Sequence, residues 1–233
     1  MGITERRERE REEVRRKILD AARDLFATLG YANVTMRKIA EAIEYSPTAI
    51  YGHFEDKDDL VHALCHEDFA RLLAVFDGQT AEVDPIERIR QLGRGYALFA
   101  RQNPNHYRFM FMTPGKFEQA HEMSAPGLEA FRRLLAAVEE GITLGRFHTN
   151  DALLISQVLW ASLHGAVALL VTYPPEQFPG APPVADLVQH TCDNALRGFL
   201  KDAGEQAGAE RRIHSGAERG GSGGRDAAPT GSI

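Results

Sequence analysis

The sequence has 233 residues, 43% of them hydrophobic, and a formal net charge of −6 at pH 7, which suits one or two domains with a sizeable core and excludes a small disulfide-stapled scaffold. The N-terminus carries charges with no apolar segment after them, so we expect no secretory signal and a cytoplasmic location. The two cysteines, Cys65 and Cys192, are far apart and fit no metal-ligand spacing, so we expect reduced thiols, no metal site and no cofactor.

Charged residues crowd the N-terminus, where a predicted arm at residues 1–11 precedes the first helix. Residues 1–60 hold 11 Lys or Arg against 13 Asp or Glu, so charge neither favours nor excludes contact with DNA phosphates. The run is typical of a solvated helix face with i,i+4 pairs such as Glu12–Arg16, and its start could also reach phosphate. Apolar residues then recur at spacings of three and four, which predicts a helix over 12–29 that ends at Gly30.

Two short capped helices follow and form the most informative stretch of the sequence. Thr35 is a good N-cap for the first, and Ser46 caps the second, with Pro47 at its first helical position. Helices this short need the preceding long helix to pack on, and we expect Ile50 and Phe54 to face inwards. The residues left facing outwards are small or hydrogen-bonding and suit a major groove: Pro47, Thr48, Ala49, Tyr51, Gly52 and His53.

The run from Asn33 to Lys57 resembles the DNA-binding domain of the TetR family of transcriptional regulators. There the helix-turn-helix closes with Tyr-x-x-Phe and a lysine that opens the next helix, and Tyr51, Phe54 and Lys57 match these positions. The resemblance implies a DNA-binding domain over residues 12–72. By correspondence with the family, phosphates are held mostly by Thr35, Ser46, Tyr51, His53 and Lys57, the bases lie nearest Pro47, Thr48 and Ala49, and Arg37 also contacts DNA.

Two positions depart from the family pattern. Glu44 stands in the turn where the family often has glycine, so a residue with a side chain occupies a position where φ can be positive, and the turn can differ in detail. Thr48 stands in the second short helix where the family often has glycine. Because this position is a candidate base contact, the operator sequence cannot be carried over from the family.

Asp56 is the predicted N-cap of a helix that runs to about Asp77 and joins the DNA-binding head to the rest. A change in the tilt of this helix is therefore a plausible way to couple the two parts. His62, Cys65 and His66 fall within one turn of it, but such residues on a helix more often pack or face solvent than coordinate a metal. Pro85 opens a helix over about 85–102, and Asn103-Pro104-Asn105 stops it. The aromatics and methionines at 106–112 suit an adaptable ligand lining or an ordinary core.

A further helix is predicted over about 125–144, and the most apolar stretch of the chain runs from Leu153 to Tyr173. That stretch is long enough to cross a bilayer. Polar residues such as Gln157 interrupt it and no basic flank follows, which favours a helix buried against a partner over a membrane span. A last helix is predicted over about 184–201, and the Gly-rich tail at 203–233 has too few apolar residues to order itself.

Trp160, His164 and Gly165 resemble the Trp-x-x-x-His-Gly signature of one C-terminal domain class of the TetR family. The resemblance implies an all-α protein with a three-helix helix-turn-helix head and a helical ligand-binding and dimerisation domain over 73–202. An apolar ligand would contact Phe99, Tyr107, Met110, Phe111, Phe131, Trp160 and His164, although His164 could equally be a satisfied core histidine. Two C-terminal helices would pair with their twofold copies through Leu153, Leu159, Leu163, Val167, Leu187 and Leu196.

The sequence therefore predicts a homodimeric DNA-binding regulator, a repressor released from a near-palindromic double-stranded operator by an unknown apolar small molecule. Half-sites would lie about one helical turn of DNA apart, or a multiple of it. The alternative is a helical small-molecule carrier or enzyme that keeps the head as a scaffold. No nucleophile elbow, phosphate-binding loop or metal quartet in the sequence supports catalysis, and no membrane partner is expected.

Overall fold

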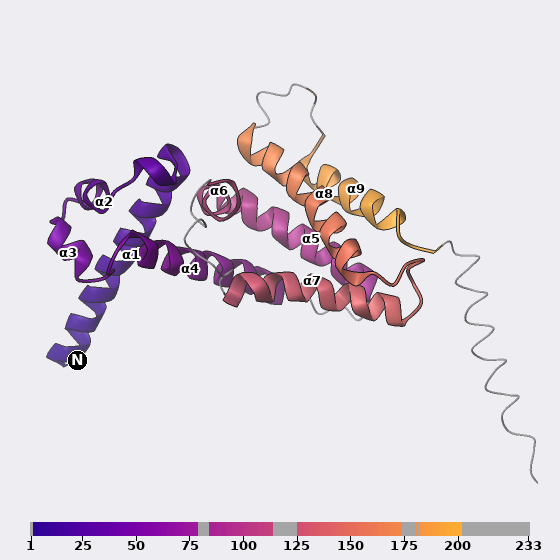
Figure 1. The fold of residues 1–233 in the computed structure, drawn as a ribbon, viewed down its shortest axis with the longest axis horizontal. Coiled ribbons are helices and arrows are strands. Elements are labelled where there is room, and N and C mark those ends of the chain that lie inside the picture. The colour runs from indigo at the N-terminus through magenta and orange to yellow at the C-terminus, as the bar shows by residue number, and fades with distance from the viewer. Residues whose placement is uncertain (1, 79–83, 114–124, 174–179, 181, 202–233) are drawn as a thin grey trace, which may run out of the picture.

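The computed structural model describes residues 2–78, 84–113, 125–173, 180 and 182–201, and within these ranges every regular element is helical. A small head at one end carries the first helices, and an elongated body carries the others (Figure 1). The elements are α1 (Ile3–Leu29), the short 3-10 helix η1 (Tyr31–Asn33), α2 (Met36–Ala42), α3 (Pro47–Tyr51), α4 (Lys57–Asp77), α5 (Pro85–Gln102), α6 (Pro104–Met112), α7 (Ala125–Thr143), α8 (Ala152–Thr172) and α9 (Val184–Arg197). The predicted tail at 203–233 lies outside the described residues.

The head has its own apolar core beneath α2 and α3. Helix α1 supplies one side of this core through Ile18 and Phe26, and the short helices add Ile39 and Ile50, all with 1% or less of their surface exposed. Helices of two turns are not stable in isolation, so this shared core is what holds the short pair in place. The inward placement predicted for Ile50 and Phe54 is confirmed.

The body packs α5, α7, α8 and α9 around a second core, and α6 bridges it to the head. Gly93 of α5 lets α9 come close, because a Cβ at this position would lie 2.7 Å from the Sγ atom of Cys192. Phe109 of α6 belongs to the head core and stacks on Phe26, with ring centroids 5.6 Å apart. The body therefore inserts one of its own side chains into the head.

Helix α4 belongs to both cores. Its first half contributes Leu60 and Leu64 to the head core, and its second half contributes Leu72 and Phe76 to the body core. Figure 1 shows this helix running from the head into the body. The predicted domain boundary at residue 72 thus falls inside one continuous helix.

The structure extends α1 beyond the predicted start at residue 12 to Ile3. The Glu5 side chain accepts a hydrogen bond from the Gly2 N–H, and Arg6 pairs with Glu10 at 2.8 Å, one turn further on. Both are interactions that stabilise a helix start, and each is readable from i,i+3 or i,i+4 spacing. Much of the predicted arm is therefore helical.

Helix α6 was not predicted from the sequence. The segment Asn103-Pro104-Asn105 does end α5, but Pro104 also occupies the first position of α6, where a missing N–H is harmless. At the C-terminus, α9 ends at Arg197, earlier than the predicted residue 201, and Gly198 follows it.

A buried ionic cluster joins the head to the body. Asp68 of α4 is fully buried and accepts hydrogen bonds from Nε of Arg23 in α1, at 3.0 and 3.1 Å. The Nη2 atom of Arg23 makes no hydrogen bond but lies 2.9 Å from the same carboxylate as an ion pair. His106 of α6 lies 2.8 Å from Asp68 through Nδ1. Three helices thus meet on one carboxylate.

We predict that Asp68→Ala destabilises the protein by about 3–5 kcal/mol, because it removes the buried counter-charge of Arg23 and leaves this guanidinium with only the exposed Asp20 carboxylate, 2.7 Å from its Nη1 atom. The matched control is Glu140→Ala, which removes a part-exposed partner of Arg88 and should lower stability by about 1 kcal/mol or less. Urea denaturation followed by circular dichroism measures both. Equal losses in the two variants would show that the buried cluster contributes no more than a surface pair.

Candidate functional site

The two short helices of the head are capped as the sequence predicts. The Thr35 hydroxyl accepts from the Lys38 N–H at 3.2 Å, and the Ser46 hydroxyl accepts from the Ala49 N–H at 3.2 Å. Each cap satisfies an N–H group that has no partner within its helix and fixes the first turn. The start of α3 is therefore a rigid, defined surface.

The outward face of this helix pair is polar and open. The side chains exposed there are Thr35, Arg37, Ser46, Pro47, Thr48 and Tyr51, and those partly covered are Ala49, His53 and Lys57. Arg37 pairs with Glu41 at 2.8 Å in full solvent, so this bond is readily exchanged for another anion. All the residues predicted to contact DNA thus lie at or near the surface of the head.

The turn between α2 and α3 contains the strained position expected from the sequence. Among the described residues, Glu44 is the one non-glycine residue with a positive φ, which is 60°. Its neighbour Tyr45 donates its backbone N–H to the Ala40 carbonyl at 2.9 Å, which closes the turn. A side chain in this region costs about 1 kcal/mol relative to glycine. The turn keeps its glycine-like backbone although it has no glycine.

Lys57 has a structural partner that sequence analysis missed. Its Nζ atom donates to the Tyr31 carbonyl at 2.5 Å and lies 3.7 Å from the centre of the Tyr31 ring. The Tyr31 hydroxyl in turn donates to Asp58 at 2.7 Å. Burial lowers the pKa of Lys57, and the nearby Asp58 partly opposes this shift. Lys57 therefore ties η1 to the start of α4.

Arginines of α1 lie close to His53 and Phe54, the residues that follow the end of α3. The guanidinium of Arg15 sits 5.3 Å from the centre of the Phe54 ring. Burial lowers the pKa of His53, and the positive charges of Arg11 and Arg15 lower it further. The Nδ1 atom of His53 is buried and lacks a hydrogen-bond partner. Positive charge from α1 is thus placed beside α3.

The body contains a cavity of about 540 Å³. Helices α4, α5, α6, α7, α8 and α9 all contribute to its wall, and none of the described residues that line it is charged. The lining residues are Cys65, Phe69, Leu72, Phe76, Ile89, Leu92, Gly93, Tyr96, Met110, Phe111, Gly127, Ala130, Phe131, Leu134, Gln157, Leu159, Trp160, Leu163 and Cys192. Its size and apolar wall are typical of small-molecule sites.

The cavity wall contains only some of the residues predicted to bind a ligand. Met110, Phe111, Phe131 and Trp160 line it, whereas Phe99 is fully buried in the core beside it and is corrected to a core residue. Tyr107 and His164 lie behind the wall. The α4 residues of the lining were missed, because an apolar stripe does not distinguish a core contact from a cavity wall.

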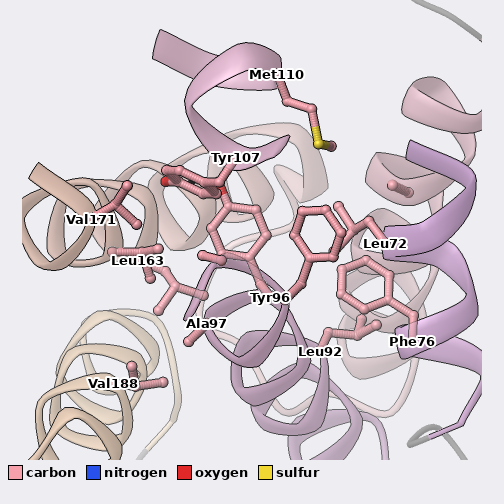
Figure 2. Close-up of a cluster of buried hydrophobic side chains, with 14 of the residues drawn as sticks. Leu72, Phe76, Leu92, Tyr96, Ala97, Tyr107, Met110, Leu163, Val171 and Val188 are labelled. Atoms are coloured by element: carbon pink, nitrogen blue, oxygen red, sulfur yellow. Dashed lines mark hydrogen bonds between the residues drawn. The ribbon is translucent and has the colours of Figure 1, made fainter. Parts of the chain in front are cut away.

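Tyr107 and His164 form a polar cluster with Tyr96. The Nδ1 atom of His164 lies 2.7 Å from the Tyr107 hydroxyl and 2.9 Å from that of Tyr96. Burial lowers the pKa of His164, so the imidazole is neutral near pH 7. Figure 2 shows Tyr96 and Tyr107 together inside the apolar cluster that Leu72 and Phe76 border from α4.

The candidate metal ligands on α4 do not converge. His62 and His66 are exposed, whereas Cys65 is buried. Nowhere in the described residues do three or more His, Cys, Asp or Glu side chains gather as a metal site would require. Burial also raises the pKa of the Cys192 thiol to about 11, so it is not a thiolate at neutral pH.

Two family models match the chain, one ending in the first half of α4 and the other beginning within α5. The model of bacterial regulatory proteins of the tetR family matches residues 18–64, and that of a tetracyclin repressor-like C-terminal domain matches residues 89–195. The chain belongs to the TetR family. TetR regulators bind DNA, dimerise and are not enzymes, so the enzyme alternative is set aside.

Curated TetR-family relatives match the head. The transcriptional repressor Rv1474c of Mycobacterium tuberculosis is 51% identical over 61 residues, which are 26% of this chain and 33% of that protein. The repressor AcnR of Corynebacterium diphtheriae is 44% identical over 78 residues, 34% of this chain and 39% of that protein. The chain thus matches well under half the length of these relatives.

Solved structures share the fold of head and body together. A TetR family regulator from Marinobacter aquaeolei is 20% identical with a TM-score of 0.64, covering 84% of this chain and 100% of that one. The TetR family regulator PfmR of Thermus thermophilus is 21% identical with a TM-score of 0.59, covering 77% and 97%. At this identity the likeness concerns the fold, and it confirms the predicted all-α architecture.

The TetR-family C-terminal helices present a different outward face from the one predicted. Leu159, Leu163, Val167 and Leu196 have 7% or less of their surface exposed, so they belong to the core of the subunit and we correct their assignment to a dimer interface. Leu187 is half-buried and Leu153 is exposed. The exposed positions of α8 include Leu154, Ala161, Gly165 and Leu169.

Helix α8 is also long and apolar enough to cross a membrane, with a mean hydropathy of 1.8. Only 28% of its apolar window is buried inside the subunit, although it packs on α5, α7 and α9. The core helix of a soluble protein passes the same test. Within the subunit, α8 has an outer face on which Leu154 and Leu169 are exposed.

Proposed function

We propose that this protein is a homodimeric transcriptional repressor that binds a near-palindromic operator and releases it when an apolar small molecule occupies the cavity. The observation that carries the proposal is that α4 forms part of the head core and also part of the cavity wall. Family membership supports DNA binding and dimerisation. The names of the curated relatives support repression.

The N-terminal end of α3 is the element we assign to the major groove. Pro47 and Thr48 are exposed there, and Ala49 is partly covered, on a helix whose start is fixed by the Ser46 cap. Side chains at the start of a recognition helix reach base edges in this docking mode. A twofold dimer then requires two half-sites related by symmetry.

Phosphates would be held around this helix by cations and hydroxyl groups. Arg37 of α2 and Tyr51 of α3 are both exposed, and Arg11 lies close enough to His53 for its charge to act on the imidazole from the side of α1. These local charges matter because the chain as a whole is acidic. Lys57 would have a double role, since its ammonium also holds the Tyr31 carbonyl.

The cavity would communicate with DNA through α4. Phe69, Leu72 and Phe76 present a wall of this helix to any ligand, and the same helix begins in the head at Lys57. A ligand shifts such an equilibrium only if it binds the two head positions with different affinity. We propose that ligand binding favours a tilt of α4 in which the paired heads no longer fit successive grooves.

The outer face of α8 is proposed as the centre of the dimer interface, with α9 beside it. Ala161 and Gly165 lie one turn apart on this face and allow a second helix to approach closely, and Leu154 and Leu169 flank them. The neighbouring α9 is more polar outwards, with His190 and Asn194 exposed. Exposed apolar side chains that lie together on one helix face are typical of a protein–protein contact.

The first test of the proposal concerns DNA. Selection from a random duplex pool at physiological salt should enrich a palindrome, on which variants are then compared. We predict that Thr48→Ala changes sequence preference, whereas Lys57→Ala weakens binding to all sequences and lowers the salt slope by about one. Lys17→Ala, an exposed cation outside the DNA-contacting set, is the control and should leave the slope unchanged. An unchanged slope in Lys57→Ala would restrict Lys57 to its bond with Tyr31.

The second test concerns the cavity. We predict that wild-type protein binds the uncharged apolar dye N-phenyl-1-naphthylamine and that Ala130→Phe weakens this binding by roughly tenfold or more, because the added ring fills the space. Ala32→Phe adds the same ring at an exposed position of the head and should have no effect. Fluorescence titration measures the affinity. Equal affinity in all three proteins would place the dye outside the cavity.

The third test concerns the dimer. We predict that Leu169→Arg converts the protein to a monomer and lowers operator affinity by at least about tenfold, because a buried unpaired charge opposes association. Leu144→Arg is a matched control, since both leucines are 59% exposed but Leu144 lies beyond the end of α7. Light scattering coupled to size exclusion gives the mass. A dimeric Leu169→Arg would exclude this face as the interface.

A further inference from the structure

Three polar groups meet at one end of the cavity, and their hydrogen bonds can be counted. Tyr96 comes from α5, Tyr107 from α6 and His164 from α8, and their polar atoms form a triangle. The sides are 2.7 Å from Tyr107 to Nδ1 of His164, 2.9 Å from Tyr96 to the same nitrogen, and 3.2 Å between the two hydroxyls. Of the three residues, Tyr96 alone lines the cavity.

The imidazole can accept only one hydroxyl proton. A neutral histidine has a single acceptor nitrogen with one lone pair in the ring plane. Tyr107 makes the shorter contact with Nδ1, and burial raises its pKa to about 12, so it keeps its proton and can donate it. The Tyr107 hydroxyl also faces the His164 carbonyl, but at 3.4 Å this acceptor is much farther away than Nδ1. Tyr107 therefore occupies the His164 acceptor nitrogen, and Tyr96 does not.

The Tyr96 hydroxyl then donates only a weak hydrogen bond within the triangle. Its remaining acceptor in the triangle is the Tyr107 oxygen at 3.2 Å, which is long for a bond between hydroxyls. The pKa of Tyr96 is raised well above its usual value, chiefly by burial, so its hydroxyl keeps its proton and acts as a donor. If His164 carried its proton on Nδ1 instead, that nitrogen would accept nothing, and Tyr96 would be left with the same long bond.

We propose that the Tyr96 hydroxyl donates a hydrogen bond to the ligand, and that the ligand is an uncharged, largely apolar molecule with an acceptor oxygen such as a ketone or ester carbonyl. This inference rests on the proposed ligand-binding function of the cavity. A carbonyl placed against Tyr96 would replace a long hydrogen bond with one of normal length. The apolar remainder of the molecule would contact Phe69, Phe111 and Phe131.

The rest of the cavity wall narrows the ligand class. None of the described lining residues carries a charge, so a carboxylate or an ammonium group placed against them would be buried without a counter-ion, at high cost. Beside Tyr96, the polar side-chain atoms of this described wall are the Gln157 amide, the Trp160 indole N–H and the weakly polar thiols of Cys65 and Cys192. A single acceptor oxygen on an apolar frame is the best match to this set.

Tyr107 is a positioning residue in this scheme. By holding Nδ1 of His164, it prevents the histidine from accepting the Tyr96 proton across 2.9 Å. Without the Tyr107 hydroxyl, the free lone pair of His164 would compete with the ligand. The Trp-x-x-x-His spacing brings Trp160 and His164 to neighbouring turns of α8, next to the same tyrosine.

The test uses two probes that differ in one group. The ketone 6-propionyl-2-(dimethylamino)naphthalene carries an acceptor oxygen, and its 6-propyl analogue does not. We expect wild-type protein to bind the ketone about tenfold more tightly after correction for partitioning between water and octanol, which corresponds to one net hydrogen bond. Bound ketone emission should be red-shifted by that bond. Tyr96→Phe should remove both the preference and the shift.

Tyr107→Phe separates a positioning role from a merely structural one. It should also lower the ketone preference and shift the emission towards the blue, although Tyr96 is still present, because His164 now takes the Tyr96 proton. Tyr45→Phe, at an exposed site in the head, is the control and should behave as wild type. Retention of the full preference in Tyr107→Phe would overturn the role given to Tyr107.

The outcomes for the wild-type protein are informative without any variant. Equal corrected affinities for the two probes, with no red shift, would overturn the inference while leaving the cavity as a ligand site. Binding of neither probe, together with no binding of the dye above, would overturn the ligand-binding proposal itself. A tighter ketone complex that persists in Tyr96→Phe would assign the donor to another residue and also overturn the inference.

Discussion

The arrangement of head and body depends on a single buried carboxylate. Asp68 lies in the middle of α4, with no exposed surface, and accepts from Arg23 of α1 while Nδ1 of His106 in α6 contacts it. A charge this deeply buried is tolerated only with good partners, so α1, α4 and α6 must meet in one geometry. Hydrophobic contacts such as the stacking of Phe26 on Phe109 are less directional than hydrogen bonds to a carboxylate. The ion pair supplies the directional constraint.

Local signals made most of the head predictable from the sequence. Thr35, Ser46 and Asp56 cap helices through bonds to N–H groups two or three residues away, which are visible in any single sequence. The positive φ at Glu44 was expected on a different ground, because the TetR family often has glycine at this position of the turn. The spacing of Ile50 and Phe54 identified the outward face of α3, and family resemblance then assigned that face to DNA.

Long-range partners could not be predicted in this way. Nothing near Lys57 in the sequence identifies Tyr31 as its acceptor, and Asp68 looks like any other acidic residue on a helix. The same limit explains the correction to the dimer face. Leu159 and Leu163 belong to the most apolar helix, but hydropathy gives the composition of a helix and not which side meets its own subunit. With apolar residues all round, α8 has no amphipathic stripe from which to choose.

These constraints also limit how a ligand could act on DNA binding. Because Arg23, Asp68 and His106 tie α1 and α6 to α4, the head cannot move along α4 without breaking a buried ion pair, which would cost several kcal/mol. A ligand that gains one hydrogen bond and some apolar contact does not favour one conformation over the other by that much binding free energy. A small rotation of the head, α4 and α6 as one unit against α5, α7, α8 and α9 leaves this ion pair intact. Such a rotation therefore costs less free energy. Tyr107 lies on α6 and Tyr96 on α5, so the hydroxyl pair spans the surface along which such a rotation would occur. A ligand that draws the Tyr96 proton away from Tyr107 would loosen one of the links between these two parts.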